Sequence, residues 1–285
     1  MMTFGELFSS EFMISLIIRA LAVGLLVSVC SSLLGVSLVL KRFSMIGDGL
    51  SHVGFGAVAL ATALNMSGMK LIFSIPIVVV TAFFLLRLGN NGKTKGDSAI
   101  AIVSTGAVAL GSLLYNMSGQ RSTDICNSLF GSASLFTIGD IDLILSIVLS
   151  VAIVILFVFF YTKIFAVTFD ESFSKATGIK TNIYNILIAI LTALTIVLGI
   201  NMMGSLMISA LIVFPAMTSM RVCKTFKGVL ITSVCVSVVC FIAGFFTACM
   251  MGWQTGACVV TANLVAFIFF FFISKIKSKS IAKTF

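Results

Sequence analysis

The sequence predicts an all-α, polytopic membrane protein, a helix bundle of about nine membrane spans. Of its 285 residues, 60% are hydrophobic and only 9% are charged, whereas soluble domains carry about 25% charged residues. Apolar runs long enough to cross a bilayer follow one another along the chain, with short polar breaks between them. Because lipid offers no hydrogen bonds to bare backbone, we expect these runs to be helices surrounded by membrane lipid.

Basic and polar breaks set the ends of the first four expected spans. The first run reaches the Lys41–Arg42 pair, and the third reaches Arg87. The fourth follows a glycine-rich, charged segment that ends at Asp97. The four spans are 14–40, 44–66, 69–87 and 98–118.

The remaining spans follow the same pattern, with one ambiguous break. Only the short stretch "NMMG" separates the sixth and seventh runs, so eight spans with one re-entrant segment remain an alternative to nine. The five spans are 138–162, 183–201, 204–220, 228–250 and 257–274. Because no long linker or polar domain interrupts the chain, we expect residues 1–285 to form a single transmembrane domain.

The net charge of +9 indicates membrane orientation and not nucleic-acid binding. If the chain crosses the membrane between successive basic groups, all 18 Lys and Arg residues except Arg19, Lys70 and Arg121 fall on one side. The positive-inside rule makes that side cytoplasmic. We therefore expect a multi-pass protein of the plasma membrane, with the N-terminus outside and the C-terminus in the cytoplasm.

The stretch "SMIGDGLSHVG" contains the only histidine of the chain, His52, four residues after Asp48. On a helix these two side chains lie about 40° apart and therefore on one face. An ionisable group at membrane depth is costly and marks a functional candidate. A carboxylate with an imidazole suits zinc or manganese. Spacing alone leaves two interpretations: contact with a metal, or a structural hydrogen-bonded pair between helices.

Small residues surround this pair and predict close helix packing. Glycine lets helices approach one another closely in lipid. The positions without a side chain are Gly47, Gly49, Gly54 and Gly56.

Two other patterns do not support a site. In "GNNGKTKGD", Arg87 stands where a phosphate-binding P-loop requires its first glycine. If the protein uses ATP, another chain must supply the nucleotide site. The seven cysteines contain no C-x-x-C pair, and their place within apolar runs is typical of small buried hydrophobic residues.

Five segments resemble, in the same order, motifs of the zinc/manganese permease family of ATP-binding-cassette importers. They are "LVLKRFSMIGDGLSHVGFGAVALA", with its Gly-Asp-x-x-x-His signature, "GDSAIAIVSTGAVALG", "TDICNSLFGSASLFTIGDIDL", "VTFDESFSKATGI" and "MMGSLMISALIVFPAMTSM". The likeness covers nearly the whole chain. It implies that Asp48 and His52 contact the passing metal, and that Gly204 and Pro215 are further helix-packing positions.

The resemblance also implies the partners. It implies a non-catalytic subunit without a resident cofactor, which carries zinc or manganese along a path formed with a second copy. A cytoplasmic ATP-binding subunit would hydrolyse ATP, and an extracytoplasmic metal-binding protein would deliver the metal. In the predicted cytoplasmic loop 163–182, a short helix ended by Gly178 is expected to dock on the ATPase. The docking residues are Phe169, Asp170, Glu171, Phe173, Ala176 and Gly178.

Two other functions fit the residues less well. A secondary, ion-coupled cation transporter usually buries several ionisable residues, but the acidic residues other than Asp48 map to loops or span ends. An intramembrane metalloenzyme typically needs three protein ligands and a water on its zinc, and one Asp–His pair falls short of that. The secondary transporter is the alternative that we keep.

Overall fold

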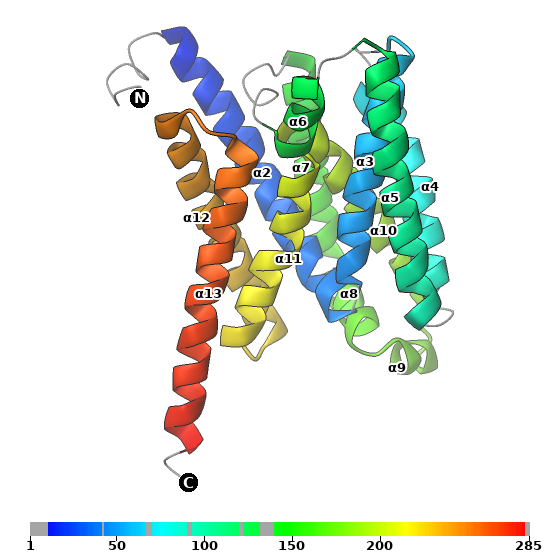
Figure 1. Cartoon of the computed structure of the whole chain (residues 1–285). Helices are drawn as coiled ribbons and strands as arrows, with labels where there is room; N and C mark the ends of the chain where they lie inside the picture. The colour runs from blue at the N-terminus through cyan, green and yellow to red at the C-terminus, as the bar shows by residue number, and fades with distance from the viewer. Residues whose placement is uncertain are drawn as a thin grey trace.

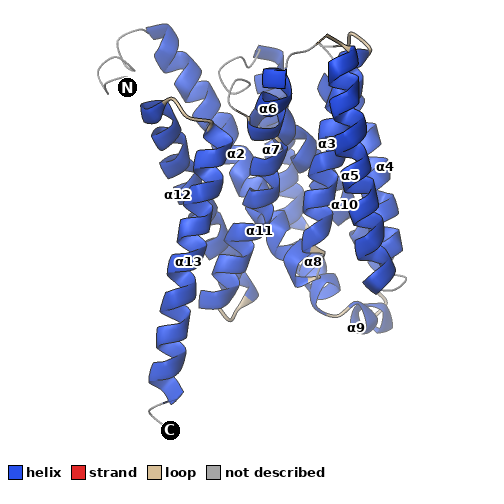
Figure 2. Ribbon diagram, viewed as in Figure 1, coloured by secondary structure: helices blue, strands red, loops and turns tan. Residues whose placement is uncertain are grey.

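The computed structural model describes residues 11–41, 43–66, 70–89, 93–119, 122–131 and 140–282. Within these residues the regular structure is entirely α-helical, as Figure 2 shows, which confirms the predicted fold class for the described part of the chain. The helices are α2 (Glu11–Leu40), α3 (Ser44–Ala63), α4 (Lys70–Gly89), α5 (Lys93–Met117), α6 (Ser122–Phe130), α7 (Asp140–Phe159), α8 (Tyr161–Phe169), α9 (Glu171–Ala176), α10 (Thr181–Met203), α11 (Ser205–Val222), α12 (Phe226–Met251) and α13 (Thr255–Ala282).

Each of the nine predicted spans coincides with one of the longer described helices, but a count of nine spans is not confirmed. Six described helices are long and apolar enough to cross a membrane, and α7 with α8 makes a seventh if the two count as one broken span. Helix α3, which carries Asp48 and His52, is not among the six. Helix α4 counts only as a shorter apolar helix over Lys70–Leu86. The chain is a multi-pass helical bundle, and the ninefold count stays a prediction.

The predicted fifth span, 138–162, corresponds to α7, but the chain bends near its end in a way that the sequence analysis did not anticipate. Residues 138 and 139 lie outside the described residues. Helix α7 ends at Phe159, and α8 continues at an angle of 69°. Hydropathy cannot show this bend, because the apolar run continues through it. The rings of Phe165 and Phe169 on α8 pack on Phe226 at the start of α12, with centroids 4.9 and 6.1 Å apart, and these contacts hold α8 in its new direction.

The predicted loop 163–182 is therefore largely helical. Helix α8 occupies its beginning, and the short helix α9 follows after Asp170. The expected short helix is present, although the sequence pattern did not indicate the helix before it.

Helix α2 runs through the middle of the bundle and packs on α11 and α12. The hydroxyls of Ser233 and Ser237 on α12 donate to the backbone carbonyls of Ser32 and Ser28 on α2, at 3.4 and 3.1 Å. At Gly35 of α2, an added Cβ would meet the backbone of Ile212 on α11. These contacts bury α2 against two later helices. They therefore fix the position of the end of α2, from which the chain enters α3.

The helix ends and connections that carry most of the basic residues lie together at one end of the molecule. The end of α2, the end of α4 with the start of α5, α9, the connection between α11 and α12, and the end of α13 all lie at the lower end of Figure 1. The start of α2, helix α6 and the connection between α12 and α13 lie at the upper end. This arrangement is the one that the basic-residue asymmetry predicts.

We expect the end that carries α9 to face the cytoplasm. In a variant whose only cysteine is Cys126, which is exposed on α6, a membrane-impermeant thiol reagent should label intact cells. In a second variant, whose only cysteine replaces Lys175, labelling should require permeabilised cells. Labelling of the second variant but not the first in intact cells would reverse the orientation.

Candidate metal site

Asp48 and His52 lie one turn apart on α3 but do not bond to each other. His52 Nε2 is 3.8 Å from Asp48 Oδ1, which is too long for a hydrogen bond. The Asp48 side chain is 47% exposed and that of His52 is 18% exposed. His52 Nδ1 is buried and has no hydrogen-bond partner among the described residues. This geometry differs from a closed, hydrogen-bonded structural pair and leaves ligand atoms of both side chains available.

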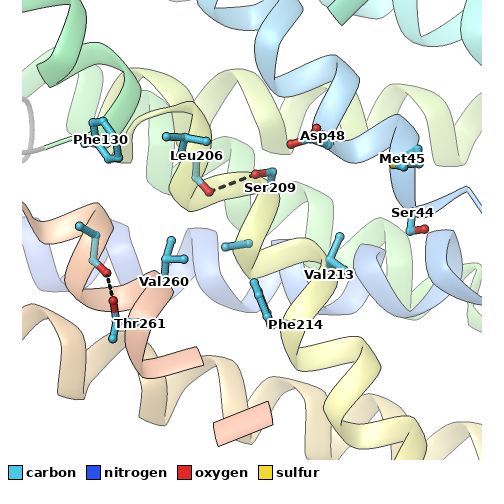
Figure 3. A pocket seen from close by; sticks show the side chains of 12 residues that line it. Ser44, Met45, Asp48, Phe130, Leu206, Ser209, Val213, Phe214, Val260 and Thr261 are labelled. Atoms are coloured by element: carbon cyan, nitrogen blue, oxygen red, sulfur yellow. Dashed lines mark hydrogen bonds between the residues drawn. The ribbon is translucent and has the colours of Figure 1, made fainter. Parts of the chain in front are cut away.

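Asp48 faces a cavity of about 520 Å³ between α3, α6, α11 and α13. Figure 3 shows its carboxylate directed from α3 toward the Ser209 side of α11. The cavity is lined by Ser44, Met45, Asp48, Phe130, Leu206, Ser209, Ala210, Val213, Phe214, Ala257, Val260 and Thr261. Among the described residues that line the cavity, Asp48 is the only charged one; His52, one turn further along α3, does not line it. The cavity therefore presents a single carboxylate in otherwise mostly apolar surroundings.

Two hydroxyl side chains that line the cavity with Asp48, those of Ser209 and Thr261, are already bonded within their own helices. The hydroxyl of Ser209 donates to the carbonyl of Leu206 at 3.0 Å. The hydroxyl of Thr261 donates to the carbonyl of Ala257 at 2.8 Å. Within the described residues, no group of three or more His, Cys, Asp or Glu side chains could hold a metal. The described residues of one chain thus present Asp48 and His52 as candidate ligands but no closed metal site.

Glycines on α3 bring neighbouring helices close to this pair. An added Cβ on Gly49 would lie 2.7 Å from Ile100 Cγ2 on α5, and one on Gly56 would lie 3.0 Å from the Ala107 carbonyl oxygen. On the other side, Gly47 faces Ile212 of α11, and Gly54 faces Ile200 of α10. All four glycines that the sequence analysis named thus lie at close helix approaches.

Helix α6 adds a residue to the cavity that the sequence analysis did not identify. Phe130, at the end of α6, lines the cavity together with Asp48. The backbone on both sides of Phe130 is held against Gly204, where an added Cβ would lie 2.6 Å from Gly131 N and 2.7 Å from the Leu129 carbonyl oxygen. The only available signal was the "LFG" stretch within one of the family-like segments.

Gly204 and Pro215 shape α11, which forms one wall of the cavity. Gly204 has φ 85° and ψ 158° and separates α10 from α11 as a single residue. This backbone conformation is essentially restricted to glycine. Pro215 lies buried inside α11, and its carbonyl accepts a hydrogen bond of 2.6 Å from the hydroxyl of Ser219.

The predicted docking segment forms a well-capped short helix at the end opposite α6. The carboxylate of Asp170 accepts from Phe173 N at 2.9 Å, and Gly178 lies just beyond the end of α9 with φ 82°. The side chains of Phe169 and Phe173 are 61% and 66% exposed, and Ala176 is also exposed. The segment therefore presents apolar surface away from the bundle.

Comparison with known proteins identifies the family. A family model described as the ABC 3 transport family matches residues 13–274. The chain belongs to the ABC 3 transport family. This match confirms the resemblance drawn from the sequence motifs, and with it the assignment of the chain as a permease that is not itself an enzyme.

Relatives and a solved structure are similar to the chain along most of its length. The chain is 30% identical to a "Probable metal transport system membrane protein" of Thermotoga maritima, over 86% of this chain and 85% of that protein. It is 26% identical to the manganese import system permease protein ScaB of Streptococcus gordonii, over 90% of each. The fold is similar to PsaBC from Streptococcus pneumoniae in complex with Fab, with a TM-score of 0.80 and 25% identity over 94% of this chain and 93% of that one.

We expect Gly204→Ala to destabilise the permease far more than Gly252→Ala. Gly252 also has a positive φ of 68°, but an added Cβ there meets nothing within 4 Å. The matched Gly252→Ala variant should therefore lose only about 1–2 kcal/mol of unfolding free energy, the penalty for a left-handed backbone. At Gly204, strain and backbone overlap together should cost about 3 kcal/mol or more. Thermal unfolding in detergent compares the two, and equal melting temperatures would contradict the assigned packing of α6.

Proposed function

We propose that this permease is the transmembrane subunit of an ATP-driven importer for divalent transition-metal ions, either zinc or manganese. The observation that carries the proposal is the position of Asp48, half exposed in a mostly apolar cavity, with His52 one turn away on the same face. The names of the relatives support the substrate class. They include the manganese permease ScaB and the zinc uptake membrane protein ZnuB of Haemophilus influenzae, which is 25% identical over 90% of this chain.

The incomplete ligand set supports a path formed by two copies. Zinc is commonly bound by four ligands, and carboxylates and imidazoles also suit manganese. One chain offers two such ligands, so the same pair from a second copy would complete a four-ligand site. Loosely arranged ligands suit transport, because an ion must leave the path as readily as it enters.

The two ends of the bundle then have different partners. The basic end would face the cytoplasm of the cell, where a separate ATP-binding subunit docks on α9 and its flanking residues Phe169, Asp170 and Gly178. The end that carries α6 would face outside and receive metal from an extracytoplasmic binding protein. No observation favours the secondary cation transporter.

We expect Asp48→Asn and His52→Ala each to lower metal uptake at least tenfold, because even the loss of a residue that only orients a metal ligand costs on the order of 10–100-fold in affinity or activity. Zinc and manganese uptake should be measured in vesicles that hold the complete transporter. Both variants should keep their melting temperature and their binding to the ATPase. Thr62→Val, which removes a hydroxyl bonded only to its own helix α3, is the matched control and should transport normally.

The structural interpretation of the pair makes the opposite prediction. If Asp48 and His52 only hold helices together, the variants should lose stability or fail to assemble, because a buried polar partner would be left unsatisfied. Stable variants with full uptake would refute the assignment of the metal path.

We expect Ala176→Glu to uncouple ATP hydrolysis from transport, because a bulky charge would be placed on the exposed apolar surface of α9. Val222→Glu adds the same side chain to an exposed position at the end of α11, outside the docking segment. That control should keep uptake and ATPase activity at wild-type levels. Normal transport by the Ala176 variant, with an unchanged ATPase rate, would place the docking site elsewhere.

A further inference from the structure

Three polar side chains join α9 to the corner between α2 and α3. Lys41 Nζ, at the end of α2, donates a short hydrogen bond to Asn185 Oδ1 on α10. Asn185 also acts on the carboxylate of Glu171, the first residue of α9, by lowering its pKa, and the hydroxyl of Thr181 at the start of α10 donates to Glu171 Oε1 at 3.5 Å. We call Lys41, Asn185 and Glu171 the Lys41 bridge.

The charges at the two ends of this bridge depend on each other. Burial lowers the pKa of Lys41 to about 8, and the negative charge of Glu171 opposes that shift. Burial acts to raise the pKa of Glu171, but hydrogen bonds from Lys175 and Asn185 and the charges of Lys175 and Lys41 outweigh it, so that pKa is lowered. A partly buried ammonium is costly without its compensating partners. Lys41 is therefore expected to follow Glu171 when the carboxylate moves.

Helix α9 is bonded at both ends, so it should move as a rigid unit together with Glu171. Its first turn is capped by Asp170. At the other end, Ile179 N donates to the Ser174 carbonyl at 3.0 Å and Gly178 N donates to the Lys175 carbonyl at 3.1 Å. This pair of bonds is the Schellman arrangement, which fixes the end of a helix. The ion pair between Glu171 and Lys175, at 2.8 Å, ties the two turns together.

At the other end of the bridge, backbone hydrogen bonds also hold Lys41 and Phe43 at the connection between α2 and α3. Lys41 N donates to the Ser37 carbonyl at 3.2 Å, and Phe43 N donates to the Leu38 carbonyl at 2.9 Å. Helix α3 begins at Ser44, three residues after Lys41, and Asp48 lies about one helical turn further on. A shift of Lys41 would reach Asp48 and His52 through this short corner and a continuous helix.

We propose that the Lys41 bridge transmits movement of α9 to α3, and so couples the docked ATPase to the metal ligands Asp48 and His52. Lys41 and Asn185 are positioning residues in this proposal, since they act through α3 and do not touch the metal. The inference rests on the proposed function, because it requires an ATPase that docks on α9.

The bridge can be tested in the complete complex with its ATPase, reconstituted in vesicles. The quantity measured is the amount of zinc or manganese transported per ATP hydrolysed. Lys41→Met should lower this ratio about tenfold, whereas Lys41→Arg, which keeps the charge, should retain most of it. Combining Lys41→Met with Glu171→Gln should lower the ratio no further than the more severe single change, because residues that act in one network are not additive. Lys180→Met removes a lysine between α9 and α10 that lies outside the bridge, and it should leave the ratio unchanged.

A second measurement separates transmission from simple stabilisation. Amide hydrogen exchange of residues 41–47 should change when ATP binds to the wild-type complex and should not change in the Lys41→Met complex. A folded Lys41→Met complex with a normal transport ratio and a normal exchange response would overturn the bridge, as would an equal loss in Lys180→Met. A wild-type complex that hydrolyses ATP without moving either metal would instead overturn the proposed function. The two failures are therefore distinguishable.

Discussion

The close packing of α3 is the constraint on which the rest of the structure depends. This helix carries the two ionisable groups at the candidate site, and it is not among the helices apolar enough to be counted as spans by themselves. It gains its burial from neighbours instead: α5 approaches at Gly49 and Gly56, and α10 and α11 approach at Gly54 and Gly47. With three helices pressed against its small residues, the face that carries Asp48 is the one left toward the cavity. The glycines thus determine both where α3 sits and which side chain it presents.

The open geometry of the candidate site has a physical cost. Asp48 and His52 remain 3.8 Å apart, and His52 Nδ1 is buried without a protein partner in the described part of the chain. An unsatisfied buried polar atom costs about 1–3 kcal/mol. In the proposed path, the Asp48 oxygens and the His52 Nε2 that remain unbonded to each other would be free to contact a passing ion, and a loose site would release that ion readily.

Structural features that depend on residues close together in the sequence could be predicted from it. Apolar runs between basic breaks indicated the long helices, and the spacing of Asp48 and His52 indicated their shared face. Features made by distant residues were not predictable in the same way. The bend between α7 and α8 falls inside one apolar run, and aromatic contacts with Phe226 hold it there. The contact of Lys41 with Asn185 joins helices far apart in sequence. Phe130 enters the cavity because α6 packs on Gly204, a contact that no periodic pattern encodes.

Metal selectivity cannot come from the ligand types of this pair alone. Carboxylate and imidazole ligands bind both ions, and the usual order of affinities places zinc above manganese at a given site. A manganese importer built on Asp48 and His52 would therefore need discrimination elsewhere, either in the binding protein that delivers the ion or in the distance between the pairs of two copies. A zinc importer would need no such device at the pair itself. If two copies form the path as proposed, the spacing of their α3 helices would be the geometric variable on which selectivity at this site depends, and the packing of α3 on α5, α10 and α11 would limit how far that spacing can change.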